Sequence, residues 1–172
     1  EFRIVTPEGV EVPERDTETP GELRIHRPVV MSGYLGLPEA GAAAFDDDGW
    51  LRTGDLARRD EEGYYRIVGR LKDINIRNGY NVYPREIEEL IYEHPGVEEA
   101  AVVGRGGATT DQQVVACLVL RDGAQEAEVI EQLRATMRQS LASYKRPQAY
   151  KVVDALPKGS TGKILKREID PS

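Results

Sequence analysis

With 172 residues, the chain is long enough for one domain, or for one small domain and part of another. Its formal net charge of −7 argues against a general nucleic-acid-binding protein, and no apolar run approaches the roughly 20 residues of a transmembrane segment. The single cysteine, Cys117, excludes a disulfide framework and a cysteine-based zinc site, so we expect a buried thiol, no metal centre and a cytoplasmic location.

Residues 1–69 are predicted to form short strands joined by turns. Alternation of polar and apolar residues, interrupted by clusters of Gly, Pro and Asp, indicates the strands. We expect them at 2–5, 21–26, 50–52, 56–58 and 64–68, with a short helix at 39–44 after Pro38. Because this meander is small and irregular, we expect it to be an incomplete β-rich piece of a larger domain.

The pattern changes near residues 69–73, where a second predicted domain, 70–172, begins. Asn78-Gly79 is a hairpin turn signal, and Pro84 opens a helix, since the first helical position needs no N–H donor. Apolar residues three and four apart predict another helix at 126–141, and strands are expected at 97–104, 114–120 and 149–153. The order βαββαβ predicts an α+β fold, in which helices flank one face of a small mixed sheet.

Positive charge gathers at the end of the chain. Residues 134–172 hold nine Lys or Arg against three Asp or Glu, whereas the other residues hold 14 against 27. A basic tail on an acidic body is compatible with a local anionic ligand. On charge alone, a solvated basic face is the favoured interpretation.

Four segments stand out, although each is weak by itself: LRTGDL at 51–56, GRLKD at 69–73, NGYNVYPREIE at 78–88 and PKGSTGK at 157–163. Thr-Gly-Asp is common in turns, where the aspartate caps backbone N–H groups. The pair Gly162-Lys163 does not belong to a phosphate-binding P-loop. Pro157 stands where that motif has its first glycine, and Ile164 stands where it has Ser or Thr.

Taken together, in this order and spacing, the segments resemble the adenylate-forming superfamily of acyl-CoA synthetases, nonribosomal peptide synthetase adenylation domains and luciferases. GELRI at 21–25 with Gly33-Tyr34 is similar to the family's G-E-L…G-Y motif. The four segments above are similar to three further motifs, Y-R-T-G-D, G-R-x-K-D…G…P-x-E-I-E and the terminal P-x-x-x-x-G-K. The resemblance covers essentially the whole chain. The segment NVYPREIE at 81–88 most resembles the fatty-acid branch of the family, the long-chain acyl-CoA synthetases.

The resemblance implies a role for each matching residue. Asp55 would hold the ribose hydroxyls of ATP, and Arg70 would add a contact to the ribose or to a phosphate. Lys72 would be the hinge on which the mobile C-terminal domain, 70–172, swings between two poses. Lys163 would be the catalytic lysine. The loop that lines the tunnel for the pantetheine arm of CoA would contain Asn78, Gly79 and Tyr80.

The reaction that the resemblance implies has two halves. A carboxylic acid, here a fatty acid, reacts with ATP and Mg to give an acyl-adenylate and pyrophosphate, and CoA then takes the acyl group and releases AMP. The family's phosphate-binding loop and acyl pocket are absent from this sequence. We therefore expect a C-terminal fragment that is inactive alone, with residues 1–69 as the last piece of the large AMP-binding domain. Apolar surface left uncovered there would favour self-association.

Three departures from the family pattern keep alternatives open. Asn78 stands where Gly or Ser is more frequent, Asn75 stands where an apolar residue is usual, and the loop 105–111 lacks the common Pro and Gly-Glu pair. An adenylation module that loads a carrier protein is one alternative, because its acceptor differs only beyond the thiol arm. A non-catalytic α/β ligand-sensing or interaction module is another, and it predicts that Asp55, Arg70 and Lys163 are dispensable.

Overall fold

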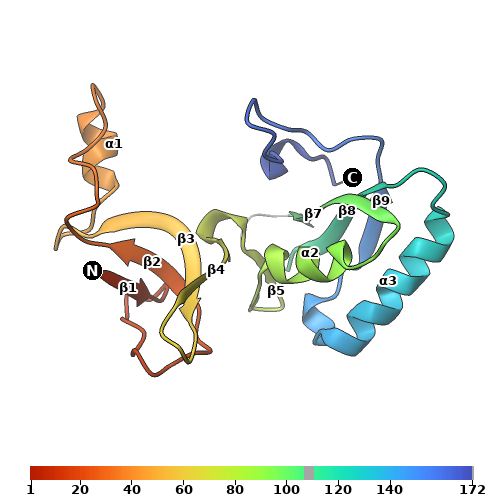
Figure 1. The fold of residues 1–172 in the computed structure, drawn as a ribbon, viewed down its shortest axis with the longest axis horizontal. Helices are drawn as coiled ribbons and strands as arrows, with labels where there is room; N and C mark the ends of the chain where they lie inside the picture. Colours follow the sequence, from red (N-terminus) through yellow and green to blue (C-terminus); the bar gives the residue numbers. More distant parts are fainter. Residues whose placement is uncertain (107–110, 172) are drawn as a thin grey trace. The chain divides into compact units, whose positions relative to one another are not determined.

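The computed structural model describes residues 1–106 and 111–171 (Figure 1). The chain divides into two compact units, Glu1–Lys72 and Asp73–Ser172, and the division falls within a short 3₁₀ turn, Leu71–Asp73. Both helices and strands are present, so the predicted α+β class is confirmed. Most of the loop 105–111 lies outside the described residues.

The first unit is an antiparallel meander with the strand order β1-β2-β3-β4. Its apolar core contains Ile4, Val12, Leu23 and Ala57. The elements are β1 (Phe2–Val5), β2 (Gly21–Ile25), α1 (Pro38–Ala43), β3 (Leu51–Arg59) and β4 (Tyr65–Arg70).

The prediction of two separate strands at 50–52 and 56–58 is wrong, because one strand, β3, runs through both segments from Leu51 to Arg59. The intervening Gly54 has a φ of +69°, and the pairing of β2 with β3 shifts register between Glu22 and Arg24. Glycine adopts this left-handed conformation readily, so the strand passes through an irregularity where the sequence pattern indicates a break.

The second unit begins with a hairpin of β5 (Asn75–Arg77) and β6 (Tyr80–Val82). Its two turn residues, Asn78 and Gly79, have φ values of +49° and +78°, as the predicted hairpin turn requires. The remaining elements are α2 (Pro84–Tyr92), β7 (Val97–Arg105), β8 (Gln113–Leu120), α3 (Glu126–Ser140) and β9 (Ala149–Val152). β7 pairs antiparallel with β8, and β8 pairs parallel with β9, so this sheet is mixed.

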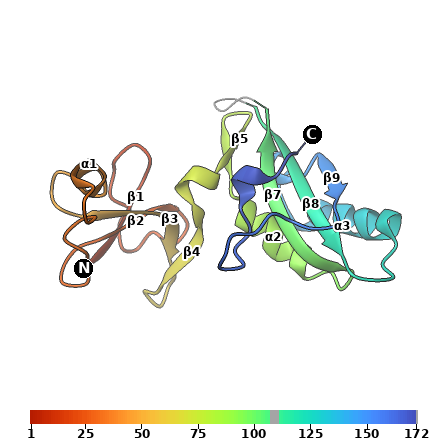
Figure 2. The same cartoon turned by 90° about the horizontal axis from the view of Figure 1, so that it is seen from above.

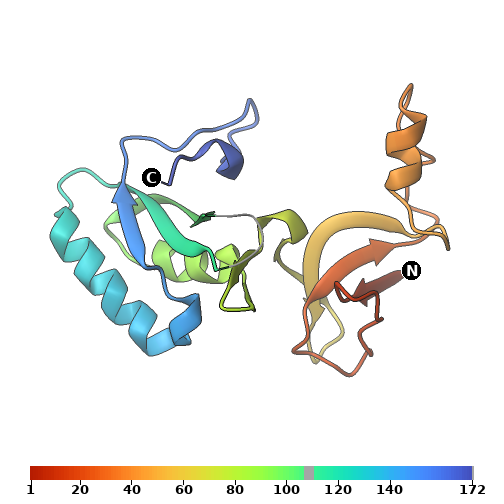
Figure 3. The ribbon, with the colours of Figure 1, turned by 180° about the vertical axis from the view of Figure 1, so that it is seen from behind.

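Both faces of the β7-β8-β9 sheet are covered, as Figures 1, 2 and 3 show. Strand residues alternate between the faces. Val102 and Ala116 pack with α2 and α3, whereas Ala101 and Cys117 pack with Leu156 of the C-terminal segment. The helices therefore lie on one face, as predicted, and the second face is covered by residues 153–169, which the sequence pattern does not indicate.

Helix α2 also covers the free edge of β7. Glu88 Oε1 accepts a hydrogen bond of 2.7 Å from Val102 N. One turn later, the Tyr92 hydroxyl accepts from Ala100 N at 3.1 Å and donates to Ala100 O at 3.2 Å. Residues four apart share a helix face, so α2 satisfies backbone groups that an exposed edge strand would leave open.

Within residues 1–106 and 111–171, no helix has the length and apolar character needed to cross a membrane.

Candidate active site

Asp55 and Arg70 form the predicted nucleotide-contacting pair in the first unit. They are cross-strand partners on β3 and β4, and Arg70 Nε lies 2.9 Å from Asp55 Oδ1. Their side chains are 37% and 38% exposed, so a ligand can reach both. The structure thus places side by side two residues that are fifteen positions apart in the sequence.

Glu22 supports the backbone beside this pair. Its buried carboxylate accepts a hydrogen bond from Gly54 N at 3.2 Å and one from Arg24 Nε at 3.1 Å. Thr53 Oγ1 donates to Leu23 O at 2.6 Å and accepts from Asp55 N at 3.1 Å. Sequence reasoning gives Glu22 no role, although the GEL motif that contains it is a signal for one.

Lys163 lies near the end of a tight loop that closes on itself, residues 157–165, which we call the lysine loop. Lys158 and Ile164 form an antiparallel bridge, and Gly159 N donates to Lys163 O at 2.9 Å. Leu165 N donates to Pro157 O at 2.8 Å. The loop therefore has its own short ladder, and it rests on the sheet through Ile164 and the buried Leu156.

Lys163 differs from most lysines of the chain, because its side chain has no partner among the residues that the structure describes. Lys145 pairs with Glu86, Lys158 with Glu99 and Lys166 with Glu88, and Lys151 donates to Asp170 O. Among the described residues, no hydrogen bond or ion pair holds the side chains of Lys72 and Lys163, and both are exposed. These are two of the residues that the motifs single out.

The predicted pantetheine loop is the exposed turn of the β5-β6 hairpin. Tyr80 stacks on Tyr144, with ring centroids 4.7 Å apart and an interplanar angle of 26°. Arg77 Nη1 donates to Tyr144 O and Arg146 O, each at 3.2 Å. The stacked pair links the hairpin to a distant part of the chain, which no local sequence pattern indicates.

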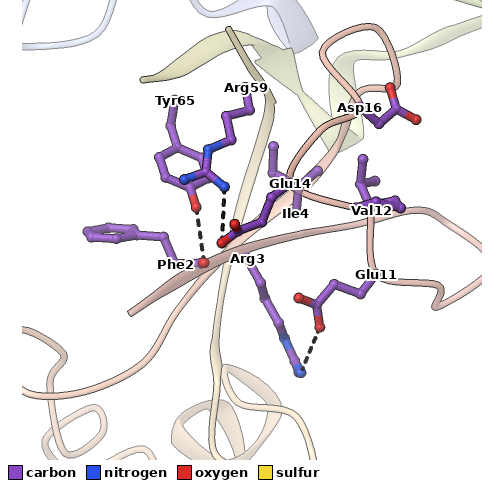
Figure 4. A pocket seen from close by; sticks show the side chains of 10 residues that line it. Phe2, Arg3, Ile4, Glu11, Val12, Glu14, Asp16, Arg59 and Tyr65 are labelled. Atoms are coloured by element: carbon purple, nitrogen blue, oxygen red, sulfur yellow. Dashed lines mark hydrogen bonds and ion pairs between the residues drawn. The ribbon is translucent and has the colours of Figure 1, made fainter. Parts of the chain in front are cut away.

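A small pocket lies in the first unit (Figure 4). Its volume is about 30 Å³, which suits a water molecule rather than a nucleotide. Glu14 and Arg59 form an ion pair of 3.2 Å across it, and the Tyr65 hydroxyl donates to Phe2 O at 3.1 Å. None of the predicted site residues lines it. Within residues 1–106 and 111–171, no three His, Cys, Asp or Glu side chains gather as metal ligands.

Residues 86–163 match the family described as the AMP-binding enzyme C-terminal domain. This chain carries the C-terminal domain of the AMP-binding, adenylate-forming enzymes. The matched segment of this AMP-binding C-terminal domain begins in α2 and ends at Lys163.

Relatives of the AMP-binding C-terminal domain extend the match over most of the chain. A long-chain-fatty-acid–CoA ligase of Bacillus subtilis is 46% identical over 149 residues, which are 87% of this chain and 26% of that protein. A sulfoacetate–CoA ligase of Cupriavidus necator is 38% identical over 167 residues, which are 97% of this chain and 32% of that protein.

Solved structures have the same fold. ATP-bound MatB from Rhodopseudomonas palustris superposes with a TM-score of 0.83 at 39% identity, and the match covers 97% of this chain and 32% of that one. The chain therefore spans about a quarter to a third of the length of these relatives.

Proposed function

We propose that this chain is the C-terminal part of an ATP-dependent acyl-CoA ligase and that Lys163 is its catalytic lysine. The observation that carries the proposal is the lysine loop. It presents an exposed ammonium group without a partner among the described residues, at the last position of the AMP-binding C-terminal match. The Bacillus subtilis and Cupriavidus necator relatives are CoA ligases for different acids, which supports the reaction class.

In the first half-reaction, a carboxylate oxygen attacks the α-phosphorus of ATP. The bond from that phosphorus to the bridging oxygen breaks, and pyrophosphate leaves with its electron pair. Two anions must approach each other, so catalysis depends on positioning and on neutralising charge. Lys163 supplies a compact positive charge on a flexible stem between the carboxylate and the α-phosphate. Mg arrives with the ATP phosphates as part of the substrate.

Asp55 is proposed to hold the ribose. A carboxylate is an acceptor with two oxygens, so it can take hydrogen bonds from the two vicinal hydroxyls of one sugar. Arg70, 2.9 Å away, fixes the orientation of that carboxylate and has further N–H donors for the ribose or a phosphate oxygen.

In the second half-reaction, the thiol of CoA attacks the acyl carbonyl carbon and a C–S bond forms. The bond from that carbon to the phosphate oxygen breaks, AMP leaves with the electron pair, and the thiol proton passes to solvent. We propose that the domain turns about Lys72, so that the lysine loop withdraws and the turn Asn78–Gly79–Tyr80 approaches the pantetheine arm. The division of the chain after Lys72 and the unpaired Lys72 side chain support a hinge there.

A fatty acid as the substrate is a narrower proposal. The NVYPREIE segment and the Bacillus subtilis relative favour it, whereas the sulfoacetate–CoA ligase is also similar to this chain. Comparing acyl-CoA formation with acetate, a medium-chain acid and a long-chain acid would decide it. Little activity with the long-chain acid would contradict the proposal.

Three further expectations stay predictions: a cytoplasmic location, lack of activity in this chain alone, and self-association of residues 1–69. The first unit exposes Val29, Leu35 and Leu37, which is compatible with the last of these.

The proposal is tested by carboxylate-dependent ATP–pyrophosphate exchange in the complete gene product that carries this chain. Lys163→Ala should reduce exchange about 10²–10³-fold, the usual loss when one electrostatic contact to a transition state is removed. Arg167→Ala, at an 80% exposed cation just beyond the lysine loop, is the matched control and should be near normal. Near-normal exchange with Lys163→Ala would contradict the proposal.

A further inference from the structure

Two ion pairs flank Lys163 in the structure. Lys158, five residues before it, pairs with Glu99 of β7, and Lys166, three residues after it, pairs with Glu88 of α2. The backbone bonds of the lysine loop join its own two arms. They therefore set the shape of the loop, and side-chain contacts at the ends of the arms orient the loop on the sheet and limit how far the arms can separate.

The Glu88–Lys166 pair is the more shielded and the better supported. Lys166 Nζ lies 2.6 Å from Glu88 Oε1, and the two side chains are 25% and 14% exposed. The same carboxylate accepts a hydrogen bond from Val102 N at the edge of β7. Glu88 is therefore fixed by a strand and a helix, and it offers Lys166 a rigid acceptor.

The Glu99–Lys158 pair lacks this support. Its side chains are 23% and 42% exposed, and no other donor to the Glu99 carboxylate is seen in the described part of the chain. Exposed ion pairs contribute about 0–1 kcal/mol in general. This pair therefore provides a control at the other arm of the same loop.

We propose that Glu88 is a positioning residue for Lys163 and that it acts through Lys166. The inference rests on the proposed function of Lys163. Three residues of extended chain span at most about 10 Å, so an anchor at Lys166 limits where the Lys163 backbone can go. Glu88 touches no substrate in this scheme. It acts by holding the end of the lysine loop against the edge of the sheet.

Variants of the complete gene product separate this role from general stabilisation. Glu88→Gln keeps an acceptor for Val102 N but removes the charge, and Lys166→Met keeps the stem but removes the ammonium. Each should lower ATP–pyrophosphate exchange about 10- to 100-fold, with the loss in kcat rather than in the KM for ATP. Lys166→Arg should restore most of the rate, and Lys158→Met should stay within about twofold of wild type.

Two further comparisons sharpen the kinetic test. Because the two residues act as a unit, the double variant Glu88→Gln/Lys166→Met should be no worse than either single variant. Thioester formation from supplied acyl-adenylate and CoA should remain near normal, because Lys163 is withdrawn in that half-reaction. An equal fall in both half-reactions would overturn positioning and leave a purely structural role.

Hydrogen exchange on this 172-residue chain tests the Glu88–Lys166 pair, which we call the clamp, without an activity assay. The amides of Gly159 and Leu165, which close the lysine loop, should exchange about tenfold faster in Lys166→Met. The amides of β8 should keep their protection. Unchanged exchange at Gly159 and Leu165 would overturn the inference.

The two proposals fail differently. If Lys163→Ala retains pyrophosphate exchange while Lys166→Met still loosens the loop, the proposed function of Lys163 is wrong and the clamp stands. If Lys163→Ala abolishes exchange while Glu88→Gln and Lys166→Met leave it unchanged, the positioning role is wrong.

Discussion

At the scale of single residues, Asp46 shows how a buried carboxylate can be kept charged. Burial opposes its ionisation, but Trp50 N donates to it at 2.9 Å, Arg24 at 2.9 Å and Arg3 at 2.6 Å. These donors outweigh the effect of burial and hold the pKa of Asp46 below its ordinary value. Asp46 therefore ties the turn before β3 to β1 and β2.

Asp46→Asn should destabilise the first unit by about 1–3 kcal/mol at neutral pH, because Arg3 and Arg24 lose the carboxylate that they share, whereas Arg24 keeps its ion pair with Glu22. An aspartate whose folded pKa is lowered adds stability above its unfolded pKa, and that stability disappears as the pH falls through the folded value. The difference between variant and wild type should therefore shrink in acid. Urea unfolding followed by the fluorescence of Trp50, the only tryptophan, measures it.

Asp47→Asn, at the exposed neighbouring carboxylate, is the control and should change little. A difference between Asp46→Asn and wild type that persists undiminished in acid would show that the lost charge is not the cause.

The same scale shows which site residues a sequence can indicate. Asp55, Arg70 and Lys163 stand in recognisable motifs, and in the structure Arg70 Nε lies 2.9 Å from Asp55 Oδ1. Glu22 and Tyr144 could not be assigned a place by local reasoning. Their contacts, with Gly54 and Tyr80, depend on strands and turns that are far away along the chain.

At the scale of elements, the β5-β6 turn was predictable because its geometry is local. Asn78 and Gly79 both have positive φ values, which only a few residue types accept. β3 was not predictable in the same way. The glycine of Thr-Gly-Asp can end a strand or bend it, and the neighbouring strands decide which.

Gly79→Ala should strain the turn by about 1–2 kcal/mol, because alanine disfavours a φ of +78° although space for its methyl group exists. If this turn approaches the pantetheine arm, thioester formation should fall about tenfold while pyrophosphate exchange is retained. Asn78→Gly, which relaxes the neighbouring position, should keep both rates. Stopped-flow assays of the two half-reactions check this, and an unaffected thioester rate would remove the turn from the CoA site.

At the scale of the whole molecule, the important feature is the division of the chain after Lys72. Asp55 and Arg70 belong to the first unit, and the hairpin turn and Lys163 belong to the second. The proposed exchange of Lys163 for the hairpin turn between the two half-reactions would need a flexible connection between the two units. The backbone around Lys72 is where that flexibility is expected.

Lys72→Pro should therefore keep pyrophosphate exchange and lose thioester formation, because proline fixes φ near −65° and restricts the preceding residue. Lys72→Ala leaves the backbone free and should keep both half-reactions. Quenched-flow measurement of each step in the complete gene product checks this. If Lys72→Pro lowered both half-reactions equally, the hinge would lie elsewhere.

The sequence by itself determined the α+β class, the helices α2 and α3, the hairpin turn and the ordered motifs that point to adenylate-forming enzymes. These features depend on periodicity, turn chemistry and spacing, which are properties of short stretches of chain. The tertiary structure alone decided that residues 153–169 cover the second face of the sheet and that Glu88 meets Lys166. Such contacts arise when segments distant in sequence bury apolar surface together and bring their charges close, which no local pattern encodes.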